Sequence, residues 1–336
     1  MLFPELCECA CGIHSVTVLN LLDAYLQGCM ELVVSHGVSV QGRRSFRQGQ
    51  REGNAASQGD LAQVHGLNWK VDKWRGFASR YMKLGERIAA KYADDLVVLS
   101  ETEWNYFLQK YNRASILIPN AIRFYERHAC SLIREKYGLE QGEYILYVGR
   151  ISPEKGTIDL VEGYCKANTG KKLVLVGPLD DSEYCKAVQQ QARNNPNIIM
   201  TDYLVGDPLK ELYSNCGLFV LPSHTEGLSL SLLEALSIGA RCLVSDIPEN
   251  TVVTDIYGAA FKPEDTDDLA RALERECAQE YPDAMRQQQI QYIHTNFEYE
   301  VMLDRYEEVY HHVVGDPLTA MPSTLKKGKV PVGAKA

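Results

Sequence analysis

The chain has 336 residues, of which 45% are hydrophobic and 24% are charged. These proportions are ordinary for a globular protein with room for two domains. Its formal net charge of −9 argues against a general nucleic-acid binder, because such proteins usually carry a basic surface. No apolar run comes near the roughly 18 residues of a membrane span, and no Lys or Arg precedes Arg43. We therefore expect a cytoplasmic protein without a transmembrane helix or signal peptide.

The first segment, residues 1–64, is atypical. Ser15 to Leu26 is compatible with a helix and Glu31 to Val34 with a strand. Gln41 to Asp60 is polar and Gly-rich, without hydrophobic periodicity, which predicts a loop or disorder. Asp60 to Val64 contains polar residues where a buried parallel strand should be apolar. We expect this segment to be partly disordered.

Residues 65–140 contain a short set of alternating elements. The sequence predicts helices at 74–92 and 103–111 and strands at 96–100 and 115–119. The segment reads as the remainder of an N-terminal α/β domain.

Residues 141–295 alternate regularly between apolar runs and helix-like segments. The strands are expected at 144–148, 172–176, 197–201, 218–221, 241–245 and 259–261. The helices between them are expected at 158–167, 182–193, 208–215 and 230–238. This order predicts a parallel sheet covered on both faces, a Rossmann-like domain, although no GxGxxG motif marks a dinucleotide site.

The end of the chain divides into a helix and a tail. Apolar residues recur at three- and four-residue steps over 297–314, which predicts one helix within a segment at 296–315. Residues 316–336 contain prolines, glycines and four lysines, and we expect a disordered tail. Its basic character suits weak contact with an anionic membrane, and a solvated tail is the alternative.

The chain has ten cysteines. Those that lie singly in apparent helices or strands predict buried free thiols, namely Cys130, Cys165, Cys185, Cys216, Cys242 and Cys277. Cys7, Cys9 and Cys11 form a C-x-C-x-C cluster able to bind a soft metal, but no second cluster with metal-site spacing follows. We expect no metal site.

Two glutamates, Glu226 and Glu234, follow the strand expected at 218–221. Gly227 lets the backbone approach a ligand, and a helix from about Ser229 offers N–H groups and a positive dipole end to phosphate. Open α/β sheets bind ligands at such turns. A ligand with phosphate and hydroxyl groups is predicted here.

The same residues have a purely structural interpretation. Ser231 and Glu234 are spaced as a capping box, and Gly239 stands where a helix C-cap glycine belongs. The segment would then be a well-terminated core helix.

A second motif is YILYVGRISPEKG, Tyr144 to Gly156. The strand ends at Gly149, and Arg150 and Lys155 follow on a loop leading into a helix. Arg can grip phosphate oxygens with two parallel N–H bonds and Lys adds a compact charge, so the pair suits a diphosphate. The alternative is two solvated surface charges.

Together the motifs resemble those of the family-4 retaining glycosyltransferases of the GT-B fold (glycosyl transferases group 1). The resemblance covers roughly His65 to Gly315. Glu226 and Glu234 match the family's EX7E motif, and residues 149–156 match its G-R-x-x-x-x-K-G loop. The resemblance implies an α/β fold with two Rossmann-like domains facing a cleft, the N-terminal one here truncated or irregular. HGLNWK, KYADDLVVLS and ILIPNAI most resemble the bacterial rhamnosyltransferase-like subgroup.

The resemblance also implies roles for single residues. Arg150 and Lys155 would neutralise the donor diphosphate, Glu226 would bind hydroxyls of the transferred sugar, and Glu234 would hold the ribose. His65 would lie at the cleft facing the donor sugar, a structural role being the alternative. The expected catalytic residues are Glu226 and His65, and the expected donor-binding residues are Gly149, Arg150, Lys155, Gly227, Leu228, Ser229 and Glu234.

The implied function is retaining transfer of a sugar from a nucleotide diphosphate donor to a glycan or lipid-linked acceptor (EC 2.4), in surface polysaccharide or glycoconjugate biosynthesis at the inner face of the membrane. Fixed positive charge would stabilise the departing diphosphate, so no metal or other cofactor is expected. A donor-binding but inactive protein with a defective N-terminal domain is the alternative. A sugar-nucleotide epimerase is disfavoured because the four charged residues follow the transferase pattern.

Overall fold

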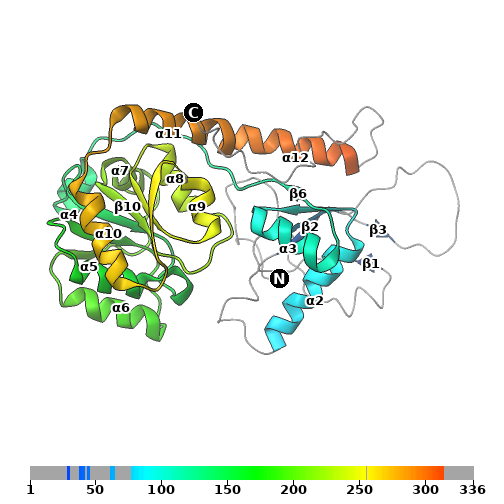
Figure 1. The fold of residues 1–336 in the computed structure, drawn as a ribbon, viewed down its shortest axis with the longest axis horizontal. Helices are drawn as coiled ribbons and strands as arrows, with labels where there is room; N and C mark the ends of the chain where they lie inside the picture. Colours follow the sequence, from blue (N-terminus) through cyan, green and yellow to red (C-terminus); the bar gives the residue numbers. More distant parts are fainter. Residues whose placement is uncertain are drawn as a thin grey trace, which may run out of the picture. The chain divides into compact units, whose positions relative to one another are not determined.

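The computed structural model describes residues 29–30, 38–41, 44–45, 61–64, 77–254 and 256–313. They fall into two compact units (Figure 1). Unit 1 takes in the described residues up to Asn120 together with helix α12 (Tyr299–Val313), and unit 2 runs from Ala121 to Glu298.

Unit 2 is built on a six-stranded parallel sheet in the order β12-β11-β10-β7-β8-β9. Residue 145 pairs with residue 173 on one side of β7 and with residue 218 on the other. The strands are β7 (Tyr144–Val148), β8 (Lys172–Val176), β9 (Ile198–Met200), β10 (Leu218–Leu221), β11 (Cys242–Ser245) and β12 (Gly258–Phe261). The central strands are buried, which explains their continuous apolar sequences. The predicted parallel sheet is confirmed.

Helices cover both faces of this sheet (Figure 1). On one face α10 packs against α5 and α5 against α6; on the other, α8 packs against α7, α9 and α11, and α7 against α4. Their bounds are α4 (Leu132–Tyr137), α5 (Thr157–Lys166), α6 (Glu183–Arg193), α7 (Asp207–Asn215), α8 (Leu230–Ser237), α9 (Pro248–Thr254), α10 (Thr266–Ala278) and α11 (Asp283–Phe297). The predicted helices of this unit begin and end within one residue of those observed.

The strand order reverses between β7 and β10. From β7 the chain builds β8 and β9 toward one edge, and then returns to place β10 on the other side of β7. The loops that follow β7 and β10 therefore lie side by side at the carboxyl edge, the point where open α/β sheets bind ligands. Both sequence motifs occupy these loops.

Unit 1 contains a four-stranded sheet in the order β2-β4-β5-β6, and a separate antiparallel pair of β1 with β3. The strands are β1 (Cys29–Met30), β2 (Val38–Gln41), β3 (Arg44–Ser45), β4 (Leu61–Val64), β5 (Asp95–Val98) and β6 (Ile116–Leu117). Among the described residues that precede Asn120, two helices accompany these strands, α2 (Phe77–Tyr92) and α3 (Glu101–Tyr111).

Strand β4 corrects the interpretation of residues 60–64 as too polar for a buried strand. It pairs parallel with β5 and antiparallel with β2, and only Gln63 is partly exposed. Three buried apolar side chains are sufficient here because the backbone is paired on both sides. Within the segment predicted as loop or disorder, Gln41 and Arg44–Ser45 are strand residues. The helix and strand expected at 15–26 and 31–34, and the tail at 316–336, lie outside the described residues.

The predicted C-terminal helix is confirmed. Expected over 297–314, it is helix α12, which begins at Tyr299, and the separate helix α11 ends just before it at Phe297. Glu298 between them has extended backbone, with ψ of 146°, which breaks the helical hydrogen bonding. Met302, Tyr306 and Val309 of α12 are buried, as their spacing predicts.

The six cysteines expected to be free thiols are free. Cys185 and Cys242 are buried, but Cys165 is exposed, so the expectation of burial was wrong for that residue. Cys7, Cys9 and Cys11 lie outside the described residues.

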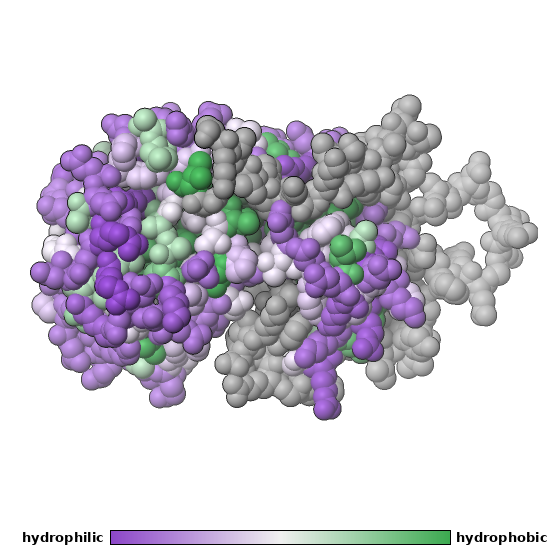
Figure 2. Space-filling model, viewed as in Figure 1, coloured by the Kyte–Doolittle hydropathy of each residue, from purple (hydrophilic) through white to green (hydrophobic). Residues whose placement is uncertain are grey.

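None of the helices in the described part is long and apolar enough to cross a membrane. Figure 2 shows a mainly hydrophilic surface on the face drawn, with hydrophobic residues in small groups.

Candidate functional site

The site lies at the carboxyl edge of the unit 2 sheet, where the loop after β7 (residues 149–156) meets the loop after β10 (residues 222–229). The first loop contains a short 3-10 helix, η2 (Pro153–Lys155), and ends at Gly156 with φ of 62°. A Cβ on Gly156 would stand 2.2 Å from the carbonyl oxygen of Pro222, so only glycine permits this approach. The two loops are in direct backbone contact.

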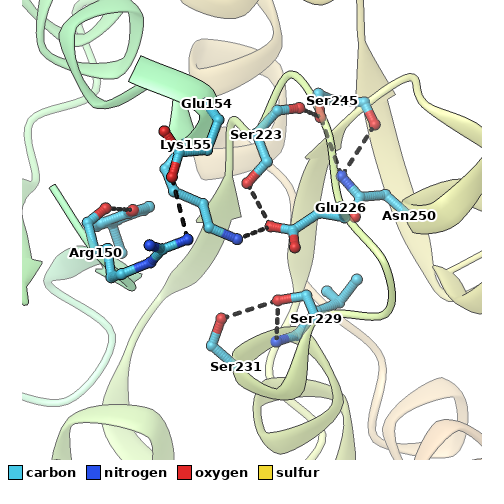
Figure 3. Close-up of polar contacts among 11 residues, drawn as sticks. Arg150, Glu154, Lys155, Ser223, Glu226, Ser229, Ser231, Ser245 and Asn250 are labelled. Carbon is cyan, nitrogen blue, oxygen red and sulfur yellow. Dashed lines mark hydrogen bonds and ion pairs between the residues drawn. The ribbon is translucent and has the colours of Figure 1, made fainter. Parts of the chain in front are cut away.

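Lys155 and Glu226 form the central contact (Figure 3). The Nζ atom of Lys155 lies 2.6 Å from Oε1 of Glu226, and their side chains are 18% and 6% exposed. Largely withdrawn from water, the pair interacts more strongly than a surface pair. The structure thus joins one residue from each of the two sequence motifs.

A chain of buried polar side chains stands behind Glu226 (Figure 3). The Ser223 hydroxyl donates to Oε1 of Glu226 at 2.7 Å. The Ser245 hydroxyl donates to the Ser223 carbonyl oxygen at 2.5 Å, and the Asn250 amide donates to the Ser245 hydroxyl at 3.0 Å. These three residues are buried and fix the Glu226 loop against β11 and α9. The sequence analysis did not identify these three residues. The available signal was that Ser223 follows the buried strand β10 and that Ser245 ends the buried strand β11.

Arg150 is the more exposed cation of the site. Its guanidinium lies 3.1 Å from a carboxylate oxygen of Glu154, and its side chain is 63% exposed. The Arg150 carbonyl accepts a hydrogen bond of 2.6 Å from the hydroxyl of the fully buried Tyr147. A Cβ on Gly149 would stand 2.7 Å from that same hydroxyl, so this glycine makes room for the tyrosine. Arg150 is therefore anchored through its backbone while its side chain faces solvent.

The third component is the start of helix α8. Its N-cap is Ser229, whose hydroxyl accepts a hydrogen bond from the Leu232 backbone N–H. The capping box expected between Ser231 and Glu234 is wrong, because both residues lie inside the helix. Gly239 does end the helix as expected, with φ of 74°. The loop at Gly227 and Leu228 leads directly into the N-terminus of α8, where the helix dipole favours a negative group.

Glu234 occupies α8 one turn after its start and is half-buried. Burial raises its carboxyl pKa above the ordinary value. Burial and the charge of Glu234 also raise the pKa of Tyr125. Within the described residues, no hydrogen bond or ion pair joins the Glu234 carboxylate to the Lys155–Glu226 pair. His65 lies outside the described residues, and its role stays a prediction.

The described side chains include no group of three His, Cys, Asp or Glu residues placed to hold a metal ion. The charged side chains that the two motifs bring to this edge are two cations, Arg150 and Lys155, and three carboxylates, Glu154, Glu226 and Glu234, beside the N-terminus of α8. This set can hold a ligand that combines phosphates with several hydroxyl groups.

The chain is similar to known glycosyltransferases. Residues 131–294 match the family model described as glycosyl transferases group 1, which spans both motif loops. The chain is 30% identical over 162 residues to the serotype-specific mannosyltransferase WbdA of Escherichia coli, covering 46% of this chain and 20% of WbdA. It is 28% identical over 233 residues to the capsular polysaccharide biosynthesis glycosyltransferase CapM of Staphylococcus aureus, covering 63% of this chain and 59% of CapM.

Among solved structures, HepE of Anabaena in complex with UDP-glucose superimposes with a TM-score of 0.64 at 15% identity. The match covers 75% of this chain and 72% of HepE. At this identity the likeness shows the fold alone, and it confirms the predicted α/β fold of the GT-B type. Residues 131–294, which match the glycosyl transferases group 1 model, make up most of unit 2.

Proposed function

We propose that this chain is a glycosyltransferase that moves a sugar from a nucleotide diphosphate donor to a glycan or lipid-linked acceptor, with retention, in surface polysaccharide biosynthesis. The observation that most supports this proposal is the 2.6 Å contact between Lys155 and Glu226. The contact joins the two motifs where the strand order reverses, within the residues that match glycosyl transferases group 1. The polysaccharide context is supported by the similarity to CapM, a capsular polysaccharide biosynthesis glycosyltransferase.

In the proposed complex the donor diphosphate lies between the loop after β7 and the start of α8. Lys155 and Arg150 supply its positive charge, and backbone N–H groups from Gly227 to Ser229 supply further donors. Lys155 then exchanges its contact with Glu226 for one with phosphate oxygen. A cation fixed at the leaving group stabilises charge that grows in the transition state, the kind of interaction that commonly contributes most to catalysis.

Release of Lys155 frees Glu226 to accept hydrogen bonds from hydroxyls of the transferred sugar. The Ser223 hydroxyl and the buried chain behind it keep this carboxylate in position. Glu234, on the same helix as the phosphate-facing N-terminus, accepts from the ribose hydroxyls. In a front-face mechanism the leaving phosphate assists the acceptor hydroxyl, so no residue of the chain is named as the base. His65 is proposed to face the donor sugar.

The test has two stages. Thermal shift with UDP, GDP, ADP and dTDP should identify a nucleotide that stabilises the protein; a ligand at 100 times its Kd adds about 2.7 kcal/mol. Sugars carried by that nucleotide are then offered with extracts of lipid-linked and glycan acceptors, and product anomers are assigned by NMR. Binding without transfer would favour the donor-binding but inactive alternative. Failure of all nucleotides to stabilise the protein would contradict the proposed site.

A further inference from the structure

The loop after β10 is attached to the loop after β7 at points outside the Lys155–Glu226 pair. The backbone N–H of His224 donates to the carbonyl oxygen of Glu154 at 2.9 Å. Two residues before His224, Pro222 is in close contact with Gly156. His224, which belongs to the loop that carries Glu226, is thus held against the loop that carries Lys155.

The His224 side chain extends this attachment to helix α5 and to the segment after β12. Its Nε2 atom lies 2.6 Å from Oδ2 of Asp159, in the first turn of helix α5, and its Nδ1 atom lies 4.0 Å from Oε1 of Glu264. The His224 and Asp159 side chains are 28% and 25% exposed. The imidazole therefore links the Glu226 loop to the helix that follows Lys155, and it lies within reach of a third segment after β12.

The charged groups around this imidazole are acidic. Asp159 comes from α5, Glu264 from the segment after β12 and Glu154 from η2. The hydrogen bond that the ring donates to Asp159 and the three carboxylate charges raise the pKa of His224 above its ordinary value of 6.5, despite burial, which opposes the shift. The protonated ring is the form that donates to Asp159 and is attracted by Glu154 and Glu264.

We propose that His224 is a positioning residue of the donor site: its imidazolium, held by Asp159, clamps the loop carrying Glu226 to the start of α5, and loss of its proton weakens nucleoside diphosphate binding. The inference rests on the proposed function, because it concerns the same site. His224 touches neither the diphosphate nor the sugar; it acts through the loops that carry Lys155 and Glu226.

The direction of the pH effect follows from the raised pKa. A histidine whose pKa is raised by the folded structure contributes its full stabilisation below the ordinary value of 6.5. The contribution is lost as the pH rises through the higher folded-state pKa. Under the proposed clamp, donor affinity should therefore weaken as the pH rises through the folded-state pKa of His224, relative to a protein that lacks this proton.

The test measures the Kd of UDP and GDP by calorimetry between about pH 6 and 9. The ligand's phosphates titrate too, so the informative quantity is the ratio of Kd values between His224→Gln and wild type. At the acidic end the variant should bind about two- to fivefold more weakly, the range for a partly exposed ion pair. At the alkaline end the ratio should approach one. Asp159→Asn should show the same profile.

His294→Gln is the matched control. His294 also faces a carboxylate, with Nδ1 3.3 Å from Oε2 of Glu298, but it belongs to α11 and contacts neither loop. It should follow the wild-type profile. A constant His224→Gln to wild-type ratio of one would overturn the clamp and leave the proposed function standing, whereas no binding of UDP, GDP, ADP or dTDP by wild type would overturn both.

A readout without ligand keeps the inference testable even if a variant folds poorly. NMR titration of the wild-type imidazoles should give His224 a pKa above 6.5, and Asp159→Asn should lower it toward that value. A wild-type His224 that titrates at the ordinary value would overturn the clamp.

Discussion

The ammonium nitrogen of Lys155 and a carboxylate oxygen of Glu226 lie 2.6 Å apart, although 71 positions separate the residues in the sequence. The two charges neutralise each other. In the proposed function, a bound diphosphate competes with Glu226 for Lys155, and donor binding releases the Glu226 carboxylate. This coupling makes both residues sensitive probes of the site.

Replacing Lys155 by Ala should weaken nucleoside diphosphate binding by roughly 1.5 to 3 kcal/mol, the range for hydrogen bonds to charged groups. Arg150→Ala should cost less, because the Arg150 side chain is 63% exposed and solvent screens it. Calorimetric Kd values for the nucleotide identified by thermal shift provide the measurement.

Lys166→Ala is the control for these two variants. Lys166 forms an exposed pair with Asp267 on the surface of the same unit, and its loss should leave nucleotide affinity unchanged. Since Lys155→Ala leaves Glu226 unpaired, its melting temperature is measured alongside, and Lys155→Arg should restore part of the affinity. Equal affinity in wild type, Lys155→Ala and Arg150→Ala would contradict the assignment.

Glu234→Gln should reduce the preference for ribose over deoxyribose. A carboxylate accepts from both vicinal hydroxyls, so wild type should bind UDP more tightly than 2′-deoxy-UDP, and the variant should lose much of that difference. The comparison is internal to each protein, which separates it from general damage to the site. An unchanged UDP to 2′-deoxy-UDP ratio in Glu234→Gln would remove Glu234 from the ribose site.

Glu234 should also make stability fall with increasing pH. Its carboxyl pKa is raised in the folded protein, so the native state binds more protons than the unfolded state above the ordinary value of 4.5. The free energy of unfolding of wild type should therefore decline, relative to Glu234→Gln, as the pH rises through the folded-state pKa. Urea unfolding of both proteins at acidic and neutral pH measures this, and parallel curves would refute it.

Ser229→Ala should destabilise unit 2 by about 1 kcal/mol, because Ser229 is the N-cap of α8. Ser231→Ala is the comparison: Ser231 lies inside the helix and makes no N-cap bond, so its loss should cost less. Chemical denaturation of the two variants decides between them. A larger effect at Ser231 would restore the capping-box interpretation.

Much of unit 2 was predictable because its strands are buried on both faces and read as continuous apolar runs, whereas its helices are not buried all round. Runs such as 144–148, 172–176 and 218–221 have the observed bounds, since the sheet at the centre of the core is built mainly from apolar residues. The strand at 61–64 was misjudged because Gln63 interrupts its apolar run, whereas pairing with both β2 and β5 is a long-range property.

The candidate site was predictable as two motifs but not as one network. Arg150, Lys155, Glu226 and Glu234 stand out by residue type and spacing. The contact of Lys155 with Glu226 depends on β7 and β10 being neighbours, and nothing in the local sequence fixes that order. The buried support from Ser223, Ser245 and Asn250 depends on the same strand order.

We propose above that the loops after β7 and β10 form one nucleoside diphosphate site. Amide chemical-shift mapping of isotope-labelled protein, titrated with the nucleotide identified by thermal shift, tests it most directly. Unit 2 offers a contrasting location, a cleft of about 590 Å³ at the amino ends of β7 and β8, lined by Lys171, Lys172, Asn195 and other polar residues. We expect the largest amide chemical-shift changes on residues 149–156 and 222–234. Shifts centred on the cleft at Lys171 and Lys172, with those loops unaffected, would contradict it.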